Sequence, residues 1–453
     1  MTQPNFFERA NNWIRSSVTI RLITIGILIL LMLIPIFMIQ DLIRERERNQ
    51  ESATYEVSRM WGESQTLHGL VLTVPYLTTE KVYDNTERST FHYEKRTEYA
   101  HFLPDKLQIN GQVKSQIRYR GIYEVVLYNS ELQVDGVIKR PDFTDWNIPK
   151  ESILWEDAFV SIGLSDLRSI QEGVTVNWNG KPHSFNPGMP TNDVFYSGIS
   201  CRVPVSTDQD KYTFNVSLNF NGSSNLSFIP LGKTTDITVR SDWPNPSFVG
   251  SFLPDERQIS DSGFTANWKV LHLNRSYPQQ FTGHRSDISE SHFGVDLIVT
   301  LDEYQKSMRA AKYAVMFITL TFLVFFFVQV LNGVRIHPIQ YIMVGLALCI
   351  FYTLLIALSE HIPFAWSYLM AAVAVVGLIT IYARSVFKKG KLTLVILGIL
   401  VLLYGFIFSI IQMEDYALLM GSIGLFISLA TAMYLSRKVN WYQLRSRGES
   451  DTA

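Results

Sequence analysis

A group of histidines and carboxylates between residues 284 and 292 is the first candidate for chemistry. His284 and His292 stand eight residues apart, with Asp287 and Glu290 between them. Imidazole and carboxylate groups are ligands that zinc accepts, so this group could bind a metal ion. The spacing matches no established metal site, and a polar loop of Gly, Ser, Asp and His explains the same residues more simply. We therefore assign no metal-binding residue from the sequence.

Other signatures of catalysis or cofactor binding do not occur in the sequence. It has no Walker A loop, no GxSxG, no HExxH and no Gly-rich dinucleotide loop, so we expect no catalytic residue and no cofactor. Its two cysteines, Cys201 and Cys349, form no CxxC pattern, and no disulfide is expected between them. The 40 basic residues are balanced by 41 acidic ones, which excludes a nucleic-acid partner recognised by bulk charge.

The distribution of charge separates a membrane region from a water-soluble one. Residues 313–435 hold only eight charged side chains, whereas residues 41–308 carry charge throughout. Apolar runs of about 20 residues are long enough to cross the hydrocarbon core of a bilayer. Six such runs occur, at about residues 22–40, 313–331, 339–358, 364–383, 392–411 and 416–435. The first run is too long for a signal peptide and no cleavage site follows it, so it predicts an uncleaved anchor.

The basic residues of the short connections predict the orientation. Lys and Arg occur before the first run, between the second and third, between the fourth and fifth, and after the sixth. The alternate connections, Ser359–Pro363 and Gln412–Asp415, contain neither. The positive-inside rule then places both termini in the cytoplasm. The predicted parts are a cytoplasmic segment 1–21, an anchor helix 22–40, an outer domain 41–312, a five-helix membrane domain 313–435 and a cytoplasmic tail 436–453.

The outer domain is predicted to be mainly antiparallel β. The alternating charges of Arg44–Arg48 first predict a helix that continues outward from the anchor. After Trp61 the pattern changes to period two, and residues 212–220 alternate strictly between apolar and polar side chains. Such alternation is typical of an antiparallel strand with one face on a core and one in water. Asn221-Gly222 is then expected to form a turn.

Further local patterns add to this prediction. Gly69–Val74 is expected to be a buried strand, and Val113–Leu127 has mostly apolar residues at its odd positions. Asp166–Glu172 is a helix candidate, with Ser165 as its N-cap and Gly173 as its end.

Close to the membrane, Val295–Leu301 is predicted to be the last strand. Asp302 is then expected to cap a helix that runs into the second membrane span. A rigid junction of this kind could transmit movement of the outer domain into the membrane.

A short sequence recurs within the outer domain. Phe102–Ile109 and Phe252–Ile259 are identical at six of eight positions. Two repeated β units, over residues 65–190 and 191–305, would explain the recurrence. The alternative is that two equivalent turns arrived at the same sequence, because Pro-Asp is well suited to a turn that ends a strand.

Several of these strings carry a resemblance to a known family. They are Gly69–Tyr76, Phe102–Asp105, Val330–Tyr341 and Leu354–His361, together with the single anchor and the large outer β domain. The chain resembles the CreD family of bacterial inner-membrane proteins over nearly its whole length. The resemblance implies a Gram-negative inner membrane, a periplasmic β domain, and a link to cell-envelope integrity and stress response. It supplies no catalytic residue.

Three functions follow from these observations. The leading one is a non-enzymatic envelope protein whose periplasmic β domain binds a protein, glycan or lipid of the envelope. The second is a transporter or lipid-handling protein built from the five clustered spans, although no Asp, Glu, Lys or Arg lies within a predicted span to couple ions. The third is a periplasmic hydrolase that uses His284, His292 and neighbouring carboxylates. Besides the lipid bilayer, no partner or oligomeric state can be named from the sequence.

Overall fold

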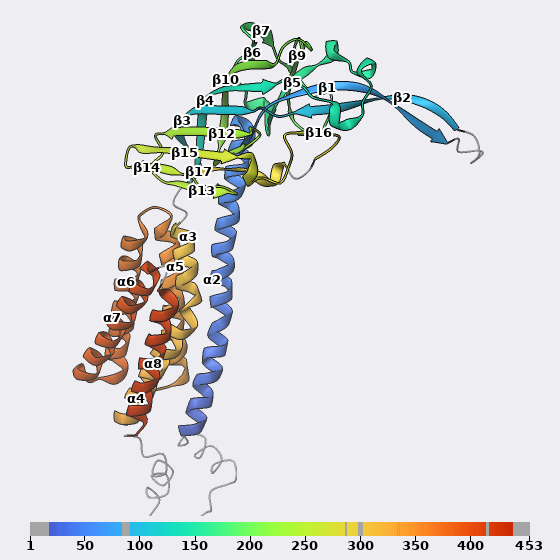
Figure 1. Cartoon of the computed structure of the whole chain (residues 1–453). Coiled ribbons are helices and arrows are strands. Elements are labelled where there is room, and N and C mark those ends of the chain that lie inside the picture. Colours follow the sequence, from blue (N-terminus) through green and yellow to red (C-terminus); the bar gives the residue numbers. More distant parts are fainter. Residues whose placement is uncertain are drawn as a thin grey trace, which may run out of the picture. The chain divides into compact units, whose positions relative to one another are not determined.

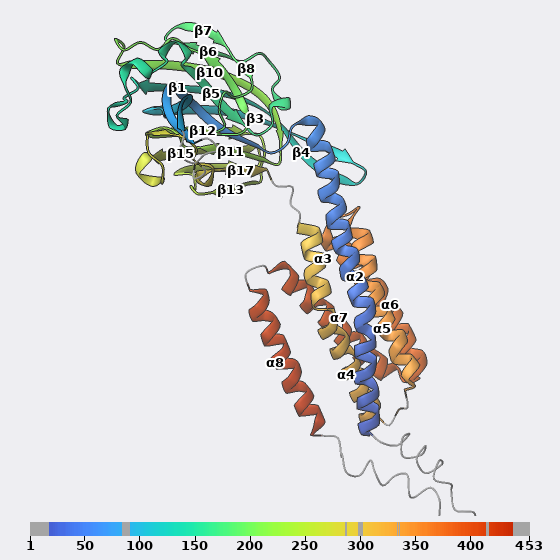
Figure 2. The same cartoon turned by 90° about the vertical axis from the view of Figure 1, so that its right-hand side faces the viewer.

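The computed structural model divides the chain into two compact units (Figures 1 and 2). One unit is formed by residues 50–300, and the other by residues 1–49 together with 301–453. The residues described are 18–83, 91–285, 288–297, 302–332, 334, 336–413 and 416–437. Within them, one long apolar helix precedes a large β-rich unit and five follow it, which confirms the predicted α+β membrane fold.

The β unit contains two sheets. The nine-stranded sheet consists of β1 (Gln65–Tyr83), β2 (Phe91–Phe102), β5 (Phe159–Leu164), β8 (Asn186–Pro187), β9 (Gly198–Arg202), β11 (Asn225–Ile229), β13 (Pro246–Gly250), β16 (Gln280–Thr282) and β17 (Phe293–Leu297). Its main order is β13-β17-β11-β1-β5-β9-β8, with β2 paired to β1 and β16 to β2. The hairpin of β1 and β2 extends past the rest of the unit (Figure 1).

The eight-stranded sheet consists of β3 (Lys106–Arg120), β4 (Tyr123–Lys139), β6 (Thr175–Trp178), β7 (Lys181–Ser184), β10 (Lys211–Ser223), β12 (Thr234–Ser241), β14 (Glu256–Ser260) and β15 (Gly263–Leu271). Its order is β14-β15-β12-β3-β4-β10-β6-β7. Only β1 with β11 and β3 with β12 are parallel among the strand pairs of the described residues. The unit is therefore mainly antiparallel, as predicted.

The two sheets share one hydrophobic core. Strand β10 shows why, because Tyr212, Phe214 and Val216 are buried while the residues between them are exposed. Between the sheets the side chain of Leu107 on β3 packs against Gly69 of β1, where an added Cβ would lie 2.7 Å from it. The predicted strands Gly69–Val74 and 212–220 are both confirmed.

The predicted turn at Asn221-Gly222 is wrong. Both residues lie inside β10, where Gly222 pairs with Tyr128 of β4. The chain turns instead at Ser224, which has a left-handed backbone with φ of 61°. Glycine is needed at position 222 because the ring of Tyr128 fills the space of its side chain, with Cζ 2.3 Å from where a Cβ would stand.

Two other local predictions need correction. Val113–Leu127 is not one strand but the closed end of the β3–β4 hairpin, where Arg120 pairs with Tyr123. Its apolar residues near the turn, among them Ile117, are exposed to solvent, so the alternation there does not mark a core face. Asp166–Glu172 forms only a single 3-10 turn, η4 (Leu167–Ser169). Asp166, not Ser165, caps this turn by accepting a hydrogen bond from the backbone of Arg168.

The recurring sequence begins two equivalent hairpins in the same sheet. The amide of Asp105 donates to the carbonyl of Val137 before β3, and the amide of Asp255 donates to the carbonyl of Asn267 before β14. The spatial order β14-β15-β12 matches β3-β4-β10, and β13-β17-β11 matches β1-β5-β9. The chain order differs, because β11 and β12 precede the other strands of their set whereas β9 and β10 follow theirs. The equivalent hairpins favour two repeated β units, which remain a prediction, but the spatial sets do not follow the division at residue 190.

The other unit contains the membrane helices. They are α2 (Val18–Trp61), of which residues 50–61 belong to the β unit, α3 (Asp302–Lys312), α4 (Ala314–Asn332), α5 (Pro338–Ser359), α6 (Phe364–Phe387), α7 (Gly390–Gln412) and α8 (Ala417–Ser436). The continuation of the anchor helix through Arg44–Arg48 is confirmed. Helix α5 begins at Pro338, and the ring of His337 accepts a hydrogen bond from the amide of Ile339. Residues 298–301, the side chain of Asp302, and most of the segments 1–21 and 436–453 lie outside the described residues.

Small residues allow the membrane helices to approach closely. A Cβ at Gly345 of α5 would stand 2.7 Å from the sulfur of Met32 on α2, and one at Gly424 of α8 would stand 2.2 Å from the ring of Phe406 on α7. This is the common use of glycine in membrane helices. Beyond the apolar part of α2, Arg46 Nε lies 3.3 Å from Glu360 Oε1 in the connection between α5 and α6.

Candidate functional site

The histidine group predicted from the sequence does not form a metal site in the described parts of the chain. Asp287 lies outside them, and His292 Nδ1 lies 3.1 Å from the carbonyl oxygen of Ser289 on an exposed turn. No group of three or more His, Cys, Asp or Glu side chains gathers around a common point among the described residues. His284 acts only electrostatically on the carboxylate of Asp193, because its charge helps to lower the pKa of that group.

A hydroxyl, an imidazole and a carboxylate do come together elsewhere. Thr73 Oγ1 lies 3.0 Å from His101 Nδ1, and His101 Nε2 lies 3.2 Å from Asp193 Oδ2. These are the residue types of a nucleophilic triad. Thr73 and His101, however, are 1% and 0% exposed, so a substrate cannot reach the hydroxyl. Hydrogen bonding to His101, opposed by partial burial, holds the pKa of Asp193 below its usual value. The contact ties β1 and β2 to the segment before β9.

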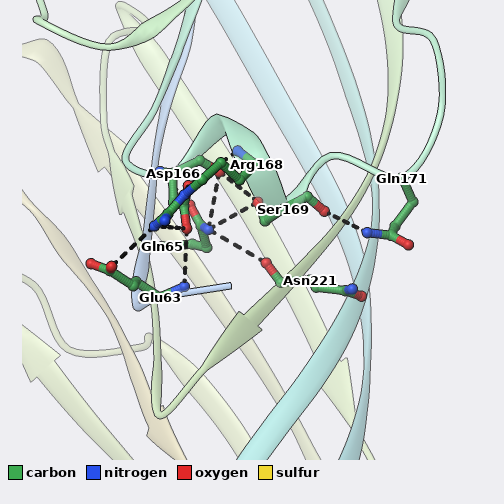
Figure 3. A network of polar contacts seen from close by, with 7 residues as sticks. All are labelled: Glu63, Gln65, Asp166, Arg168, Ser169, Gln171 and Asn221. Atoms are coloured by element: carbon green, nitrogen blue, oxygen red, sulfur yellow. Dashed lines mark hydrogen bonds and ion pairs between the residues drawn. The ribbon is translucent and has the colours of Figure 1, made fainter. Parts of the chain in front are cut away.

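A second buried network surrounds the start of β1 (Figure 3). Gln65 is 0% exposed, and its amide nitrogen donates to Ser169 Oγ at 3.0 Å and to the carbonyls of Asp166 and Asn221 at 3.4 Å. Its amide oxygen accepts from the backbone of Asp166 at 3.2 Å. Gln65 thus uses both ends of its side chain to join β1, η4 and β10.

The carboxylate of Asp166 completes this network. Arg168 donates from Nε to Oδ1 at 2.9 Å and from Nη2 to Oδ2 at 3.0 Å, and it also reaches Glu63 at 3.1 Å. Burial alone would raise the pKa of Asp166, but hydrogen bonds from Arg168 and from the amide of Glu63 outweigh it and hold the pKa low. We name Glu63, Gln65, Asp166, Arg168, Ser169 and Asn221 the buried network.

The last residues of α2 are fixed beside this network. Trp61 Nε1 donates to the carbonyl of Tyr128 at 3.2 Å, and the guanidinium of Arg118 lies 4.9 Å from the centre of the Trp61 ring. Gly62 has φ of 149°, and a Cβ there would lie 2.8 Å from the carbonyl oxygen of Asn221. These contacts stabilise the helix-to-strand transition, and they expose no group for a ligand.

The solvent-facing side of the eight-stranded sheet has a different character. Three rows of side chains cross it from β14 to β10 or from β15 to β6, each row following the pairing of neighbouring strands. The first row is Gln258, Thr265, Arg240, Gln112, Glu131 and Asn219; the second is Glu256, Asn267, Thr238, Asn110, Gln133 and Ser217; the third is Lys269, Asp236, Gln108, Asp135, Asn215 and Asn177. We name these 18 residues the polar face.

The composition of the polar face departs from that of an ordinary solvated sheet. Half of its residues are Asn or Gln, and no aliphatic or aromatic residue occurs at any of its positions. Asn is depleted in strands, and Lys, Glu and Thr suffice to keep a sheet soluble. Where local propensity is violated repeatedly on one surface, function is the usual reason. The face holds four acidic and two basic residues, so it is close to neutral.

Neighbouring side chains hold one another in place on this face. Asn215 Nδ2 donates to Asp135 Oδ1 at 2.6 Å, and Ser217 Oγ donates to Gln133 Oε1 at 2.9 Å. Asn219 Nδ2 donates to Glu172 Oε1 at 2.8 Å. Each amide has one acceptor oxygen and two N–H donors, so these bonds leave capacity for a ligand.

Three hollows lie along the polar face. The largest, about 430 Å³, is lined by Gln112, Arg240, Gln258 and Thr265, and one of about 340 Å³ by Gln108, Asp135, Asn177 and Asn215. The third, about 390 Å³, is lined by Asp236, Thr238, Asn267 and Lys269. The face can therefore bind an extended molecule through many hydrogen bonds.

Two polar residues of α4 in the membrane unit form hydrogen bonds with helices. Thr319 donates to the carbonyl of Val315 in its own helix at 2.7 Å. Gln329 of α4 accepts a hydrogen bond at 2.9 Å from the hydroxyl of Tyr341 on α5. Gln329 therefore joins α4 to α5, whereas the hydroxyl of Thr319 bonds within its own helix.

Comparison with known proteins agrees with the architecture. Residues 17–442 match the family model described as "CreD: Inner membrane protein CreD". The chain belongs to the CreD family. It is also 31% identical to Inner membrane protein CreD of Escherichia coli strain K12 over 420 residues, which cover 91% of each chain. Together with the six apolar helices, this makes the chain a multi-pass inner-membrane protein.

CreD-family membership assigns no catalytic residue, and the sequence patterns alone located neither buried cluster. Thr73, His101 and Asp193 are too far apart in the chain to be recognised as a group. The polar face did leave a signal, because the even positions of β3 and the odd positions of β10 are rich in Asn and Gln. These residues can be recognised as one continuous surface only when the strand pairing is known.

Proposed function

We propose that this CreD-family protein maintains the cell envelope by binding an envelope component on the periplasmic side, without catalysis. The observation that carries the proposal is the polar face, a large surface of fixed hydrogen-bonding side chains with no apolar cover. A binding module needs such a surface, whereas an enzyme needs a reactive group that its substrate can reach. The buried hydroxyl of Thr73 does not meet that requirement.

The periplasmic placement rests on the distribution of Lys and Arg. The basic connections alternate with connections that have no Lys or Arg, which is the pattern of the positive-inside rule. The Arg46–Glu360 ion pair supports it, because it joins two segments that the prediction assigns to the same side of the membrane. Both termini are then cytoplasmic and residues 41–312 are periplasmic.

A photoreactive amino acid placed at Gln133 in the full-length protein tests the binding role in intact cells. Gln133 lies in the second row, between Asn110 and Ser217, and is exposed. We expect a discrete crosslinked product of higher mass, formed with an envelope component. The matched control carries the same amino acid at Gln209, an exposed residue before β10 and outside the polar face.

Two outcomes would count against the proposal. Equal products at Gln133 and Gln209 would mean that the polar face has no special partner. A cysteine at Ser217 that reacts only with reagents that enter the cytoplasm would place the β unit on the wrong side of the membrane. Both measurements use the intact protein in its membrane.

A further inference from the structure

We infer that the polar face binds an uncharged, polyhydroxylated chain, that is, a glycan strand, laid along its rows. The inference rests on the proposed function and specifies the chemical class of the partner. It is drawn from three properties of the surface: the kind of hydrogen-bonding group it presents, its balance of charge, and its lack of apolar anchors.

The hydrogen-bonding groups fit hydroxyl and acetamido substituents. A side-chain amide offers one acceptor and two donors, and a sugar hydroxyl offers both a donor and acceptor lone pairs. Nine Asn and Gln residues are spread over all three rows. Asn215 and Gln133 are already held by Asp135 and Ser217, so binding costs little side-chain entropy.

The charge of the face argues against an anionic partner. Arg240 and Lys269 are outnumbered by the acidic residues of the 18 positions, and Lys114 beside the face is paired with Glu131 at 2.8 Å. Phosphate-rich ligands need clustered Arg or Lys. The face would therefore not bind a lipid headgroup that carries phosphate.

The lack of apolar anchors argues against a folded protein. Interfaces between proteins depend on buried Trp, Tyr, Met or Arg that fill pockets on the partner. The 18 positions hold no aromatic or aliphatic residue and only one Arg, Arg240. Two exposed aliphatic side chains, Ile259 and Leu271, line the rims of two hollows, but no aromatic side chain is exposed beside them to anchor a partner. A ligand that is itself a series of hydroxyl groups is the class that remains.

The dimensions of the face fit a chain more than a single sugar. Neighbouring strands lie about 4.8 Å apart, so a row that crosses six strands extends roughly 24 Å. One hollow lies on the first row over β14, β15, β12 and β3, one on the second and third rows over β14, β15 and β12, and one on the third row over β3, β4, β10 and β6. Several consecutive sugar residues would thus contact one row at the same time.

Full-length protein in lipid nanodiscs, titrated with an N-acetylglucosamine hexasaccharide, tests this inference. We expect saturable binding that changes less than about twofold between low and high salt, because no charge is involved. The double variant Asn110→Ala/Gln133→Ala, which removes two neighbouring amides of the second row, should bind about tenfold more weakly. Gln209→Ala, the control outside the face, should bind as the unchanged protein does.

The outcomes separate the inference from the proposed function. Suppose that Gln133 forms crosslinks in cells. If the protein then does not bind the hexasaccharide, or if the double variant binds it with undiminished affinity, the glycan strand is overturned and the binding role remains. Tight, salt-sensitive binding of vesicles rich in an anionic phospholipid would also overturn it. Failure of both the crosslinking and the titration would remove the two proposals together. Unchanged thermal unfolding of the double variant shows that a lost affinity is not lost folding.

Discussion

The buried network and the polar face are made from the same few residue types in the same β unit. In the buried network, the side chains of Gln65 and Asp166 form hydrogen bonds inside the protein. On the polar face, Gln133 and Asn215 form hydrogen bonds with neighbouring side chains of the sheet and retain donors that face solvent. The comparison teaches that burial, not residue type, decides whether an amide stabilises the fold or is available to a partner.

The largest expected effect comes from Gln65→Ala. The change removes a fully buried side chain and deprives the buried amide of Asp166 of its hydrogen-bond acceptor. Buried polar groups that lose their partners cost about 1–3 kcal/mol, so we expect the β unit to lose roughly 2–3 kcal/mol. Urea unfolding of the full-length protein in detergent, followed by tryptophan fluorescence, measures the loss.

The matched control for that prediction is Gln133→Ala. It deletes the same side chain from the exposed face and should change the free energy of unfolding by no more than about 0.5 kcal/mol. If the two variants were equally unstable, the division between a stabilising network and a binding surface would be wrong. If both were fully stable, the buried network would not anchor β1.

The next effect concerns the core beneath both regions, through Gly222→Ala. The new Cβ would stand 2.3 Å from Cζ and Oη of Tyr128, whose hydroxyl donates to the carbonyl of Asn225 at 2.7 Å. Forcing this ring to move should cost about 1–3 kcal/mol. Gly173→Ala is the control, because nothing lies within 4 Å of its added Cβ. A fall in the melting temperature for Gly173→Ala as large as for Gly222→Ala would contradict the steric explanation.

Sequence patterns predicted the parts of the fold that depend on periodicity along one segment. The six spans and the strand 212–220 were found because length and alternation are local properties. Asn221-Gly222 was misread as a turn, because only the pairing with β4 shows that Tyr128 requires a glycine there. The helix at Asp166–Glu172 was overestimated for a similar reason. Its residues are drawn into a single turn by Gln65 and Arg168, which local propensity does not consider.

The candidate site divides in the same way. The sequence located His284 and His292 because they are close along the chain, and the described structure does not join them in a metal site. It missed the polar face, whose rows are assembled from seven strands and include the parallel pairing of β3 with β12. Register between distant strands is the information that a single sequence lacks.

A moderate effect of pH should distinguish the two regions. Asp193 has a lowered pKa in the folded protein, chiefly because of His101, so its ionised form stabilises the fold. That contribution is present above the unfolded pKa and is lost as the pH falls through the folded pKa. We expect the melting temperature to fall on acidification from pH 7 to about pH 3, and to fall less for Asp193→Asn.

Glycan binding should respond differently to the same change. The amides of the polar face do not titrate, so affinity for the hexasaccharide should persist at every pH at which the protein stays folded. An Asp193→Asn variant with an unchanged pH dependence of its melting temperature would contradict the role given to Asp193. A steep loss of affinity before any unfolding would instead show that ionisable groups of the face take part in binding.

The smallest expected effect comes from Glu131→Gln, which breaks an ion pair on the polar face itself. The side chains of Lys114 and Glu131 are 56% and 50% exposed, and exposed pairs contribute about 0–1 kcal/mol, so unfolding should change by less than about 0.5 kcal/mol. Asp166→Asn makes the same chemical change at a carboxylate that is only 8% exposed, so it should lower the free energy of unfolding more than Glu131→Gln does, although its partner Arg168 is 60% exposed and solvent screens the pair. Glu131→Gln also adds one more amide to the first row without adding charge. Hexasaccharide binding that is unchanged or stronger, in a variant of unchanged stability, would therefore support a surface that recognises hydroxyl groups. A clear loss of binding would show that the carboxylate of Glu131 itself accepts hydrogen bonds from the ligand. Salt-insensitive binding of the unchanged protein would then identify the donors as hydroxyl groups, whereas binding that weakens at high salt would indicate a positively charged partner and contradict the glycan.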